Sequence, residues 1–375
     1  MRIGIDARLA DAPRTGIGSY TANLVAALVR AGAPERFLLF TDQPSPALPG
    51  PGFESVVVPG GRRLLWTFGS LPGACRRARL DLFHGTTNFE VPAFAGCPLV
   101  ATVHDLIPLR FPAAVSSRFR LLFRALIGRT IRASRRVITV SEFTRREILE
   151  RWPSAADKVA VVPNGVDPAF SAAGDAAEDR RVRERHGLAG RYLLFVGVFE
   201  PRKNVPLLVD AFEILRHTRP EASDLQLALA GGAGWRGEVI AEGVRSRGLD
   251  PAVKLLGYVP EADLPALYRG AALAVIPSQY EGFGLPAIEA MACGAPVLAS
   301  DAAALPETVG DAGELFTPGD PGTLARRIAD LAAAPGRLAA MREKGIARAA
   351  GFSWDRTAAR TLEVYRDALR GARPR

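Results

Sequence analysis

Short apolar runs alternate with longer amphipathic segments along the whole chain, and this rhythm restricts the fold more than any other feature. It is typical of parallel sheets whose strands are joined by helices on both faces. The sequence therefore predicts an α/β protein. The expected strands are Ile3–Asp6, Phe37–Thr41, Val56–Val58, Asp81–His84, Leu99–His104, Val137–Ser141, Val159–Val162, Tyr192–Val196, Leu225–Ala230, Val253–Leu256, Leu273–Ile276 and Val297–Ser300.

The rhythm breaks at Pro163–Pro168, which is rich in turn formers and precedes a stretch without strand character. Because 375 residues are too many for one typical core, we place a domain junction here. We expect two doubly wound parallel-sheet domains, 1–170 and 171–352, which bind ligands in a cleft at the carboxyl ends of their strands. Residues 353–375 are expected to form a helix, capped by Ser353, that packs back on the N-terminal domain.

Charge and composition limit the partners. The net charge is +9, but the basic residues are spread along the chain without a nucleic-acid-binding motif, so we expect no nucleic-acid partner. Anionic small molecules or a lipid surface fit the charge better. The first strand begins at the N-terminus, no secretory signal is visible and no apolar run could span a bilayer, which favours the cytoplasm. Cys75, Cys97 and Cys293 are scattered and suggest neither a disulfide framework nor a zinc site.

The most informative stretch is Tyr280–Val297. Gly282 and Gly284 permit a tight turn whose backbone amides can approach an anion. Pro286 suits the first position of a helix, and the dipole at a helix N-terminus favours phosphate. We therefore predict that this turn binds a diphosphate. The competing interpretation is an ordinary loop and helix cap.

Two glutamates flank this turn. Glu281 precedes the helix and Glu289 lies about one turn inside it, so both can accept hydrogen bonds from sugar and ribose hydroxyls. Two glutamates separated by seven residues in this setting resemble the donor-binding signature of the retaining glycosyltransferases of family 4. The resemblance implies the GT-B architecture, two Rossmann-like domains with an interdomain cleft, and adds Phe283 and Leu285 to the donor site.

The loop before the first helix resembles the family's glycine loop, which approaches the donor phosphates through Gly16 and Gly18. A dinucleotide-binding fingerprint competes, with Asp42 as the ribose-binding acid. That pattern fails because Thr21 stands where its third glycine belongs. The resemblance therefore favours a sugar nucleotide over NAD.

His104 ends a strand and resembles the histidine that the family places beside the transferred sugar. On position alone, a structural histidine is an equally good interpretation. In the family's arrangement, a neutral imidazole or the backbone carbonyl would position the donor sugar and the incoming hydroxyl.

The segment Phe195–Asn204 supplies two cations. The resemblance implies that Lys203, with Arg202, neutralises the leaving diphosphate, whereas a solvated basic turn is the alternative. Many relatives carry an arginine where this chain has Val198, so the role is assigned to Lys203 first. A turn around Val259 resembles the family's base-contacting turn.

Residues 116–136 contain seven arginines interleaved with apolar residues, as in a basic amphipathic helix that lies on an anionic membrane. The competing interpretation is a surface helix that packs its apolar side on the sheet. The family's lipid-linked acceptors keep peripheral contact with the inner face of the cell membrane open.

Together these residues predict a retaining hexosyltransferase, with His104, Lys203 and Glu281 as catalytic residues. Thr102–Leu109 looks most like users of GDP-mannose, as in bacterial mannosyltransferases of surface polysaccharide synthesis, and UDP-sugars are the alternative donors. The acceptor is expected to be a hydroxyl of a glycan or a lipid-linked glycan. We expect no metal and no cofactor besides the nucleotide-sugar, since no Asp-x-Asp motif stands in the right context. An NAD-dependent oxidoreductase or epimerase, and a non-catalytic sugar-nucleotide-binding protein, are the alternatives from other classes.

Overall fold

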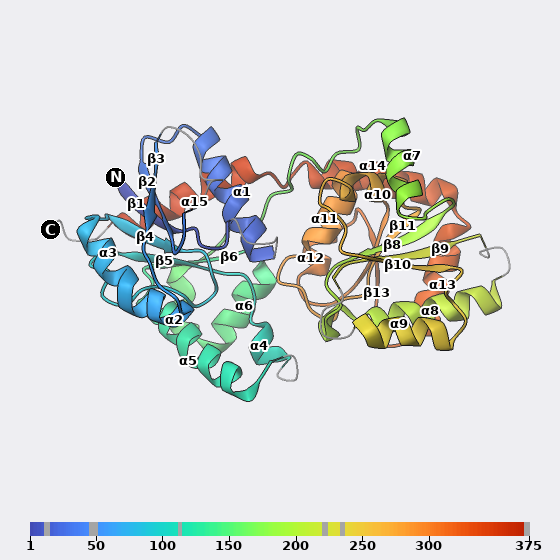
Figure 1. Cartoon of the computed structure of the whole chain (residues 1–375), viewed down its shortest axis with the longest axis horizontal. Coiled ribbons are helices and arrows are strands. Elements are labelled where there is room, and N and C mark those ends of the chain that lie inside the picture. Colours follow the sequence, from blue (N-terminus) through green and yellow to red (C-terminus); the bar gives the residue numbers. More distant parts are fainter. Residues whose placement is uncertain (11–15, 45–51, 112–114, 220–223, 233–236, 371–375) are drawn as a thin grey trace. The chain divides into compact units, whose positions relative to one another are not determined.

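The computed structural model describes residues 1–10, 16–44, 52–111, 115–219, 224–232 and 237–370, and it divides into two compact units (Figure 1). The first unit comprises Met1–Gly165 and the segment from Ser353 onward, and the second is Val166–Phe352. The boundary precedes the expected junction after residue 170. The reason is that Phe170 packs edge to face on Tyr268 of the second unit, with ring centroids 6.0 Å apart.

Seven parallel strands form the sheet in the described part of the first unit, in the order β3-β2-β1-β4-β5-β6-β7. The order reverses between β1 and β4, as in doubly wound sheets, whose ligands bind at the carboxyl ends of the strands. The strands are β1 (Arg2–Asp6), β2 (Arg36–Thr41), β3 (Phe53–Val57), β4 (Leu82–Gly85), β5 (Leu99–Val103), β6 (Arg136–Thr139) and β7 (Val159–Val161).

The described part of the second unit contains six parallel strands in the order β10-β9-β8-β11-β12-β13. Here the order reverses between β8 and β11. The strands are β8 (Tyr192–Val196), β9 (Gln226–Ala230), β10 (Val253–Gly257), β11 (Leu273–Ile276), β12 (Val297–Ser300) and β13 (Glu314–Phe316).

Helices cover both faces of each sheet (Figure 1). Those of the first unit are α1 (Gly16–Arg30), α2 (Arg63–Leu65), α3 (Leu71–Arg77), α4 (Ile107–Arg110), α5 (Ser117–Ala133), α6 (Glu142–Arg151) and α15 (Trp354–Leu369). Those of the second are α7 (Ala176–Arg185), α8 (Val205–Thr218), α9 (Gly237–Ser246), α10 (Leu264–Gly270), α11 (Leu285–Ala292), α12 (Leu305–Val309), α13 (Pro321–Ala332) and α14 (Pro335–Ala349). None of the described helices is long and apolar enough to cross a bilayer.

The last helix, α15, belongs to the first unit and packs on α1. Ser353 caps it, because the Ser353 hydroxyl accepts a hydrogen bond from the backbone N–H of Arg356 at 3.3 Å. The hydroxyl of Tyr365, on its buried face, lies 2.7 Å from Nδ1 of His84, and Nε2 of His84 lies 2.8 Å from the hydroxyl of Thr102. A buried chain of hydrogen bonds therefore joins the C-terminal helix to strands β4 and β5.

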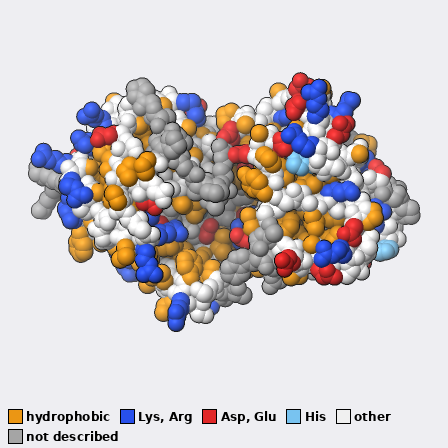
Figure 2. Space-filling model, viewed as in Figure 1, with side chains coloured by type: hydrophobic (Ala, Val, Ile, Leu, Met, Phe, Trp, Pro, Cys, Tyr) orange, Lys and Arg blue, Asp and Glu red, His pale blue; other side chains and the backbone are white. Residues whose placement is uncertain are grey.

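The α/β fold class expected from the sequence is confirmed: two parallel sheets, each with helices on both faces. Every expected strand overlaps an observed one, although β3 begins earlier, at Phe53. The sequence analysis missed β13, a three-residue edge strand that begins with Glu314. Basic side chains are scattered over the visible face of both units (Figure 2), in line with their spread along the sequence.

Candidate active site

The glycine turn of the second unit leads directly into α11. Gly284 has φ +96°, in the left-handed region that favours glycine, and a Cβ there would lie 2.8 Å from Cδ2 of Leu305. The hydroxyl of Thr308 donates a hydrogen bond to the carbonyl of Phe283 and so fixes the turn. The helix begins at Leu285, so Pro286 occupies its second position instead of the first. The turn thus aims the N-terminus of α11, with its partial positive charge, beyond the sheet edge.

Glu281 lies just before this turn and is buried, with 6% of its surface exposed. Its Oε1 accepts hydrogen bonds from Nζ of Lys203 at 2.6 Å and from the hydroxyl of Ser278 at 2.7 Å. Its Oε2 accepts one from Arg202 at 3.0 Å. The structure therefore brings together Glu281, Lys203 and Arg202, which the sequence placed in the site from two separate motifs.

Burial alone would raise the pKa of Glu281. This effect is outweighed by the charges of Lys203 and Arg202 and by the hydrogen bonds from Lys203 and Ser278, so the pKa of Glu281 is lowered. Two cations thus share this buried carboxylate, and Arg202 is also paired with a second carboxylate, that of Glu200.

Arg202 is held on several sides. It donates to Oε2 of Glu200 at 2.8 Å and to the carbonyl of Tyr280 at 3.1 Å, besides its bond to Glu281. Both cations sit at the end of the short 3-10 helix Pro201–Lys203, which follows β8, the first strand of the second unit. Because β8 and β11 are neighbours, the cations meet Glu281 at one sheet edge.

Glu289 lies on the second turn of α11 and accepts a hydrogen bond from the hydroxyl of Tyr268 at 3.3 Å. Burial raises its pKa to about 7, against the lowering effect of the bond from Tyr268, and the charge of Glu261 raises it further. Its carboxyl group is therefore close to half ionised at neutral pH. Val259, expected near the base, follows β10 and has a buried side chain.

His104 follows β5 at the carboxyl edge of the first sheet and is 7% exposed. Its Nε2 lies 2.9 Å from the carbonyl of Thr86, so Nε2 carries the proton and Nδ1 is left as an acceptor. Its backbone N–H donates to Oδ1 of Asn88 at 2.7 Å. Burial lowers the pKa of His104 to about 4, against the raising effect of the bond to Thr86. The imidazole is therefore neutral at physiological pH.

Gly16 opens α1 and Gly18 lies buried in its first turn. The ring of Tyr20, on the same helix, packs edge to face on His104, with centroids 4.7 Å apart. The start of α1 and His104 therefore share one edge of the first sheet. Within the described residues, no group of three His, Cys, Asp or Glu side chains is arranged to hold a metal ion.

The sequence reasoning missed a buried ionic cluster at the same edge. Arg8 donates to Oδ2 of Asp6 at 2.7 Å and to Oε2 of Glu90 at 2.9 Å. Its guanidinium lies 3.9 Å from the ring centre of Trp66. Asp6 does end the first strand in the sequence, but nothing there indicates that Glu90 joins it. Ser278, which donates to Glu281, was also missed, because a lone serine carries no sequence pattern.

Solved structures of other proteins share this fold. Sucrose-phosphate synthase from Thermosynechococcus elongatus matches with a TM-score of 0.78 and 24% identity, over 99% of this chain and all of that one. Anabaena HepE, solved in complex with UDP and glucose, matches with a TM-score of 0.77 and 20% identity, over 98% of this chain and all of that one. The fold is therefore GT-B.

Sequence comparison gives the family. The profile of Glycosyltransferase Family 4 matches residues 14–170, and that of Glycosyl transferases group 1 matches residues 177–348. O-antigen chain mannosyltransferase B of Escherichia coli is 33% identical over 288 residues, which cover 76% of this chain and 74% of the relative. D-inositol 3-phosphate glycosyltransferase of Kineococcus radiotolerans is 32% identical over 84% of this chain and 80% of the relative. The chain belongs to glycosyltransferase family 4.

Proposed function

We propose that the chain transfers a hexose from a nucleotide diphosphate donor to a hydroxyl of a glycan or lipid-linked acceptor, with retention of anomeric configuration and without a metal. The observation that carries this proposal is the buried cluster of Lys203, Arg202 and Glu281 beside the N-terminus of α11. Positive charge from two side chains and a helix end suits a diphosphate, whose charge grows as the glycosidic bond breaks.

Each residue has a distinct part in the proposed reaction. Lys203 and Arg202 stabilise the leaving diphosphate, and the amides after Gly284 bind its oxygens. Glu281 uses its one remaining acceptor site for a sugar hydroxyl, since its two oxygens offer about four acceptor sites and three are used. Glu289 binds the ribose. Because His104 is neutral, it positions the sugar and the acceptor instead of supplying charge, and the donor phosphate takes the acceptor's proton.

GDP-mannose is our first choice of donor. The support is the relative named O-antigen chain mannosyltransferase B, together with the residues Thr102–Leu109 noted above. UDP-sugars are the second choice. Titration of the full chain with GDP-mannose, UDP-glucose and NAD, followed by calorimetry, separates these donors from each other and from an oxidoreductase. Saturable binding of NAD alone would contradict the proposal.

Activity is tested with two variants. Lys203→Gln removes one charge from the cluster, and we expect donor hydrolysis and transfer to fall by about a hundredfold, the usual effect of losing one electrostatic group. Lys344→Gln, an exposed lysine of the same unit, is the control. Unchanged hydrolysis in Lys203→Gln would remove the cluster from the mechanism, and absence of all hydrolysis in the wild type would favour a non-catalytic binding protein. The anomeric configuration of the product, read by NMR, tests retention.

The exposed residues of helix α5 are the support for a membrane contact. Phe123, Ile127 and Ile131 are at most 1% exposed and pack in the core, so much of its apolar side faces the sheet. Near its N-terminus, however, Leu121 is 70% exposed and Leu122 is 38% exposed, among the exposed arginines of this turn. We propose that this end of α5 contacts the inner face of the cell membrane from the cytoplasm. Co-sedimentation with anionic liposomes that weakens with salt would support this, and indifference to lipid charge would contradict it.

A further inference from the structure

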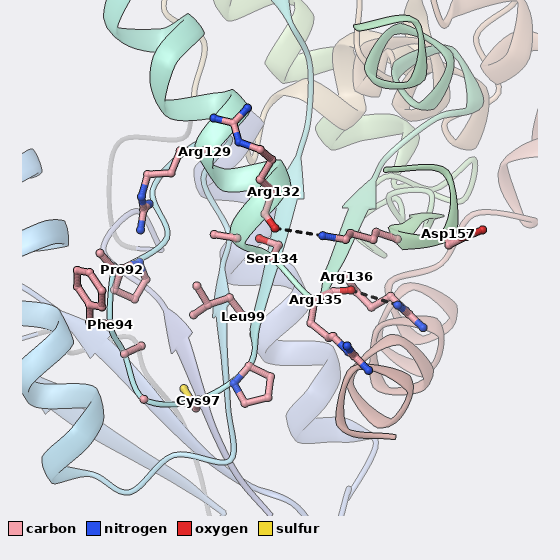
Figure 3. Close-up of a pocket in the computed structure, with 16 residues that line it drawn as sticks. Pro92, Phe94, Cys97, Leu99, Arg129, Arg132, Ser134, Arg135, Arg136 and Asp157 are labelled. Atoms are coloured by element: carbon pink, nitrogen blue, oxygen red, sulfur yellow. Dashed lines mark hydrogen bonds between the residues drawn. The ribbon is translucent and has the colours of Figure 1, made fainter. Parts of the chain in front are cut away.

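The cavity at the amino ends of β5 and β6 does not form a site for a single anion, although cations line it. Its volume is about 1040 Å³. Figure 3 shows the guanidinium groups of Arg132 and Arg135 pointing apart and out of this cavity. Arg135 donates to the carbonyl of Arg370 at 3.5 Å. The groups around Glu289 in the second unit, in contrast, converge on one carboxylate.

A buried tyrosine holds one oxygen of this carboxylate. Tyr268, on α10, is 1% exposed, and its hydroxyl donates a hydrogen bond to Oε2 of Glu289 at 3.3 Å. Helix α10 packs on α11, which carries Glu289. Burial and the charge of Glu289 raise the pKa of Tyr268 well above its ordinary value, so the hydroxyl keeps its proton and acts as the donor. The Glu289 carboxylate is therefore fixed from the interior of the unit.

The other oxygen of the carboxylate is open to a ligand. Glu289 is partly exposed, and among the described residues its Oε1 accepts no hydrogen bond. A carboxylate oxygen has lone pairs for about two hydrogen bonds. The hydroxyls of a ribose can therefore approach Glu289 from this side while Tyr268 holds Oε2.

The ring of Tyr268 is held in turn by the segment that lies between the unit boundary and α7. Phe170 of this segment is 5% exposed and packs edge to face on Tyr268, with ring centroids 6.0 Å apart. Arg269, the next residue of α10, donates to the carbonyl of Ser171 at 3.0 Å and to both carboxylate oxygens of Asp179 at 2.6 and 2.7 Å. The position of the Tyr268 ring thus depends on this segment as well as on α10.

We propose that Tyr268 is a positioning residue of the donor site: it orients the Glu289 carboxylate toward the ribose of the donor, and Phe170 keeps Tyr268 in place. The inference rests on the proposed function, because it takes Glu289 to be the residue that binds the ribose. A carboxylate that is already held loses less conformational freedom when the ligand binds, so its affinity is higher. Tyr268 therefore affects ligands that carry ribose hydroxyls and leaves other ligands unaffected.

Calorimetric titration of the full chain with GDP and with 2′,3′-dideoxy-GDP tests the proposal, and UDP and 2′,3′-dideoxy-UDP form the second pair of probes. The dideoxy compounds keep the base and the diphosphate but lack both ribose hydroxyls. We expect Tyr268→Phe to weaken the binding of GDP or UDP about fivefold, the usual effect of losing one hydrogen bond, and to leave binding of the dideoxy compounds unchanged. Equal weakening of both forms, or of neither, would overturn the proposal.

Tyr192→Phe is the matched control. Tyr192 is buried in the same unit, and its hydroxyl donates to the carbonyl of Leu267, the residue before Tyr268, at 2.6 Å. The change removes a buried hydroxyl that holds α10 through its backbone instead of through Glu289, so affinity for GDP and UDP should stay at the wild-type value. A loss equal to that of Tyr268→Phe would show that α10 supports the site only as a scaffold, against the proposal.

A double-mutant cycle shows whether Tyr268 acts through Glu289. Glu289→Ala removes the carboxylate, so adding Tyr268→Phe to it should not weaken GDP or UDP binding further. A further fivefold loss would mean that Tyr268 acts on the ligand by another route.

Phe170→Leu tests the contribution of the connecting segment. It removes the aromatic ring that packs on Tyr268 and should weaken GDP or UDP binding about twofold in the wild-type background, but not in Tyr268→Phe. No change in the wild-type background would remove Phe170 from the proposal.

These outcomes differ from a failure of the proposed function. A wild-type chain that binds neither GDP nor UDP would contradict the donor site and, with it, the role of Tyr268. Wild-type binding that Tyr268→Phe does not weaken would leave the donor site in place and overturn only the role of Tyr268.

Discussion

At the residue scale, one buried carboxylate organises the proposed donor site. Glu281 binds Lys203, Arg202 and Ser278 through its two oxygens, and the two cations come from a distant part of the chain. The sequence predicted Glu281 and the two cations through two separate motifs, and it missed Ser278. It could not predict that they bind one another, because a pairing across β8 and β11 exists only once the sheet has formed.

Glu281→Gln is expected to destabilise the second unit by about 3 kcal/mol, because the buried Lys203 would lose its counter-charge and Arg202 would keep only that of Glu200. The free energy of unfolding from urea titration measures this. Glu242→Gln, which breaks an exposed pair with Arg245, is the matched control and should cost less than about 1 kcal/mol. If both variants unfold alike, the buried cluster does not contribute to stability as we infer.

Donor affinity should depend on the ionisation of Glu289, whose pKa burial raises to about 7. Only the carboxylate accepts hydrogen bonds from both ribose hydroxyls. Between pH 6 and pH 8 its ionised fraction rises from about one tenth to nine tenths, so affinity should increase about tenfold. The groups that act on this pKa are Tyr268, Glu261, Lys203 and Asp167.

Calorimetry of donor binding across this pH range provides the measurement. Glu289→Gln cannot ionise, so its affinity should be lower at pH 8 and constant with pH. The same slope in this variant and in the wild type would assign the titration to another group.

At the element scale, the strands were the predictable part of the fold. Most of the expected strands are runs of apolar residues buried on both faces, and such runs stand out in a sequence, whereas β3, β7 and β10 are partly exposed. The edge strand β13 was missed because it is short and begins with Glu314, which is only partly buried. The start of α11 was also predictable, since Gly284 and Pro286 each favour one backbone conformation. The contact of Tyr20 with His104 was not, because it depends on elements that are distant in sequence, and the contact of Ser278 with Glu281 was missed because a lone serine carries no pattern.

The docking of α15 gives a prediction at this scale. Tyr365→Phe removes the hydroxyl that lies 2.7 Å from Nδ1 of His84 and leaves a buried polar atom without its partner. We expect the first unit to lose about 1–2 kcal/mol of unfolding free energy. Tyr258→Phe is the control, because Tyr258 is 76% exposed and should contribute within about 0.5 kcal/mol. Equal stability of the two variants would show that the hydrogen-bond chain does not hold α15 in place.

At the scale of the whole molecule, the two units should respond to acid in opposite directions. In the first unit, burial lowers the pKa of His84 to about 3 and that of His104 to about 4, from 6.5. The stability of the first unit that depends on these neutral histidines is fully present above pH 6.5. It is lost as the pH falls from 6.5 toward the lowered pKa values. In the second unit, the raised pKa of Glu289 has the reverse sign, and its contribution is lost as the pH rises from 4.5 to about 7.

Lowering the pH from 7 to 5 should therefore destabilise the first unit by about 2 kcal/mol for each of these two histidines. Differential scanning calorimetry at the two pH values measures this as a melting transition of the first unit that moves to lower temperature. His217→Gln, at an exposed histidine of the second unit, should leave that shift intact. A first-unit transition that is independent of pH would mean that His84 and His104 titrate normally in the folded state.

The first unit is assembled from both ends of the chain, since α15 joins Met1–Gly165 only after Val166–Phe352 has been traversed. During synthesis, the sheet that carries His104 must therefore wait for the final helix to leave the ribosome, whereas Val166–Phe352 is contiguous and can fold as soon as it emerges. A prematurely terminated product would contain an intact donor-side unit beside an N-terminal unit whose Tyr20 and His84 lack their cover. Proteases are therefore expected to cleave the N-terminal unit of such a product before they cleave Val166–Phe352.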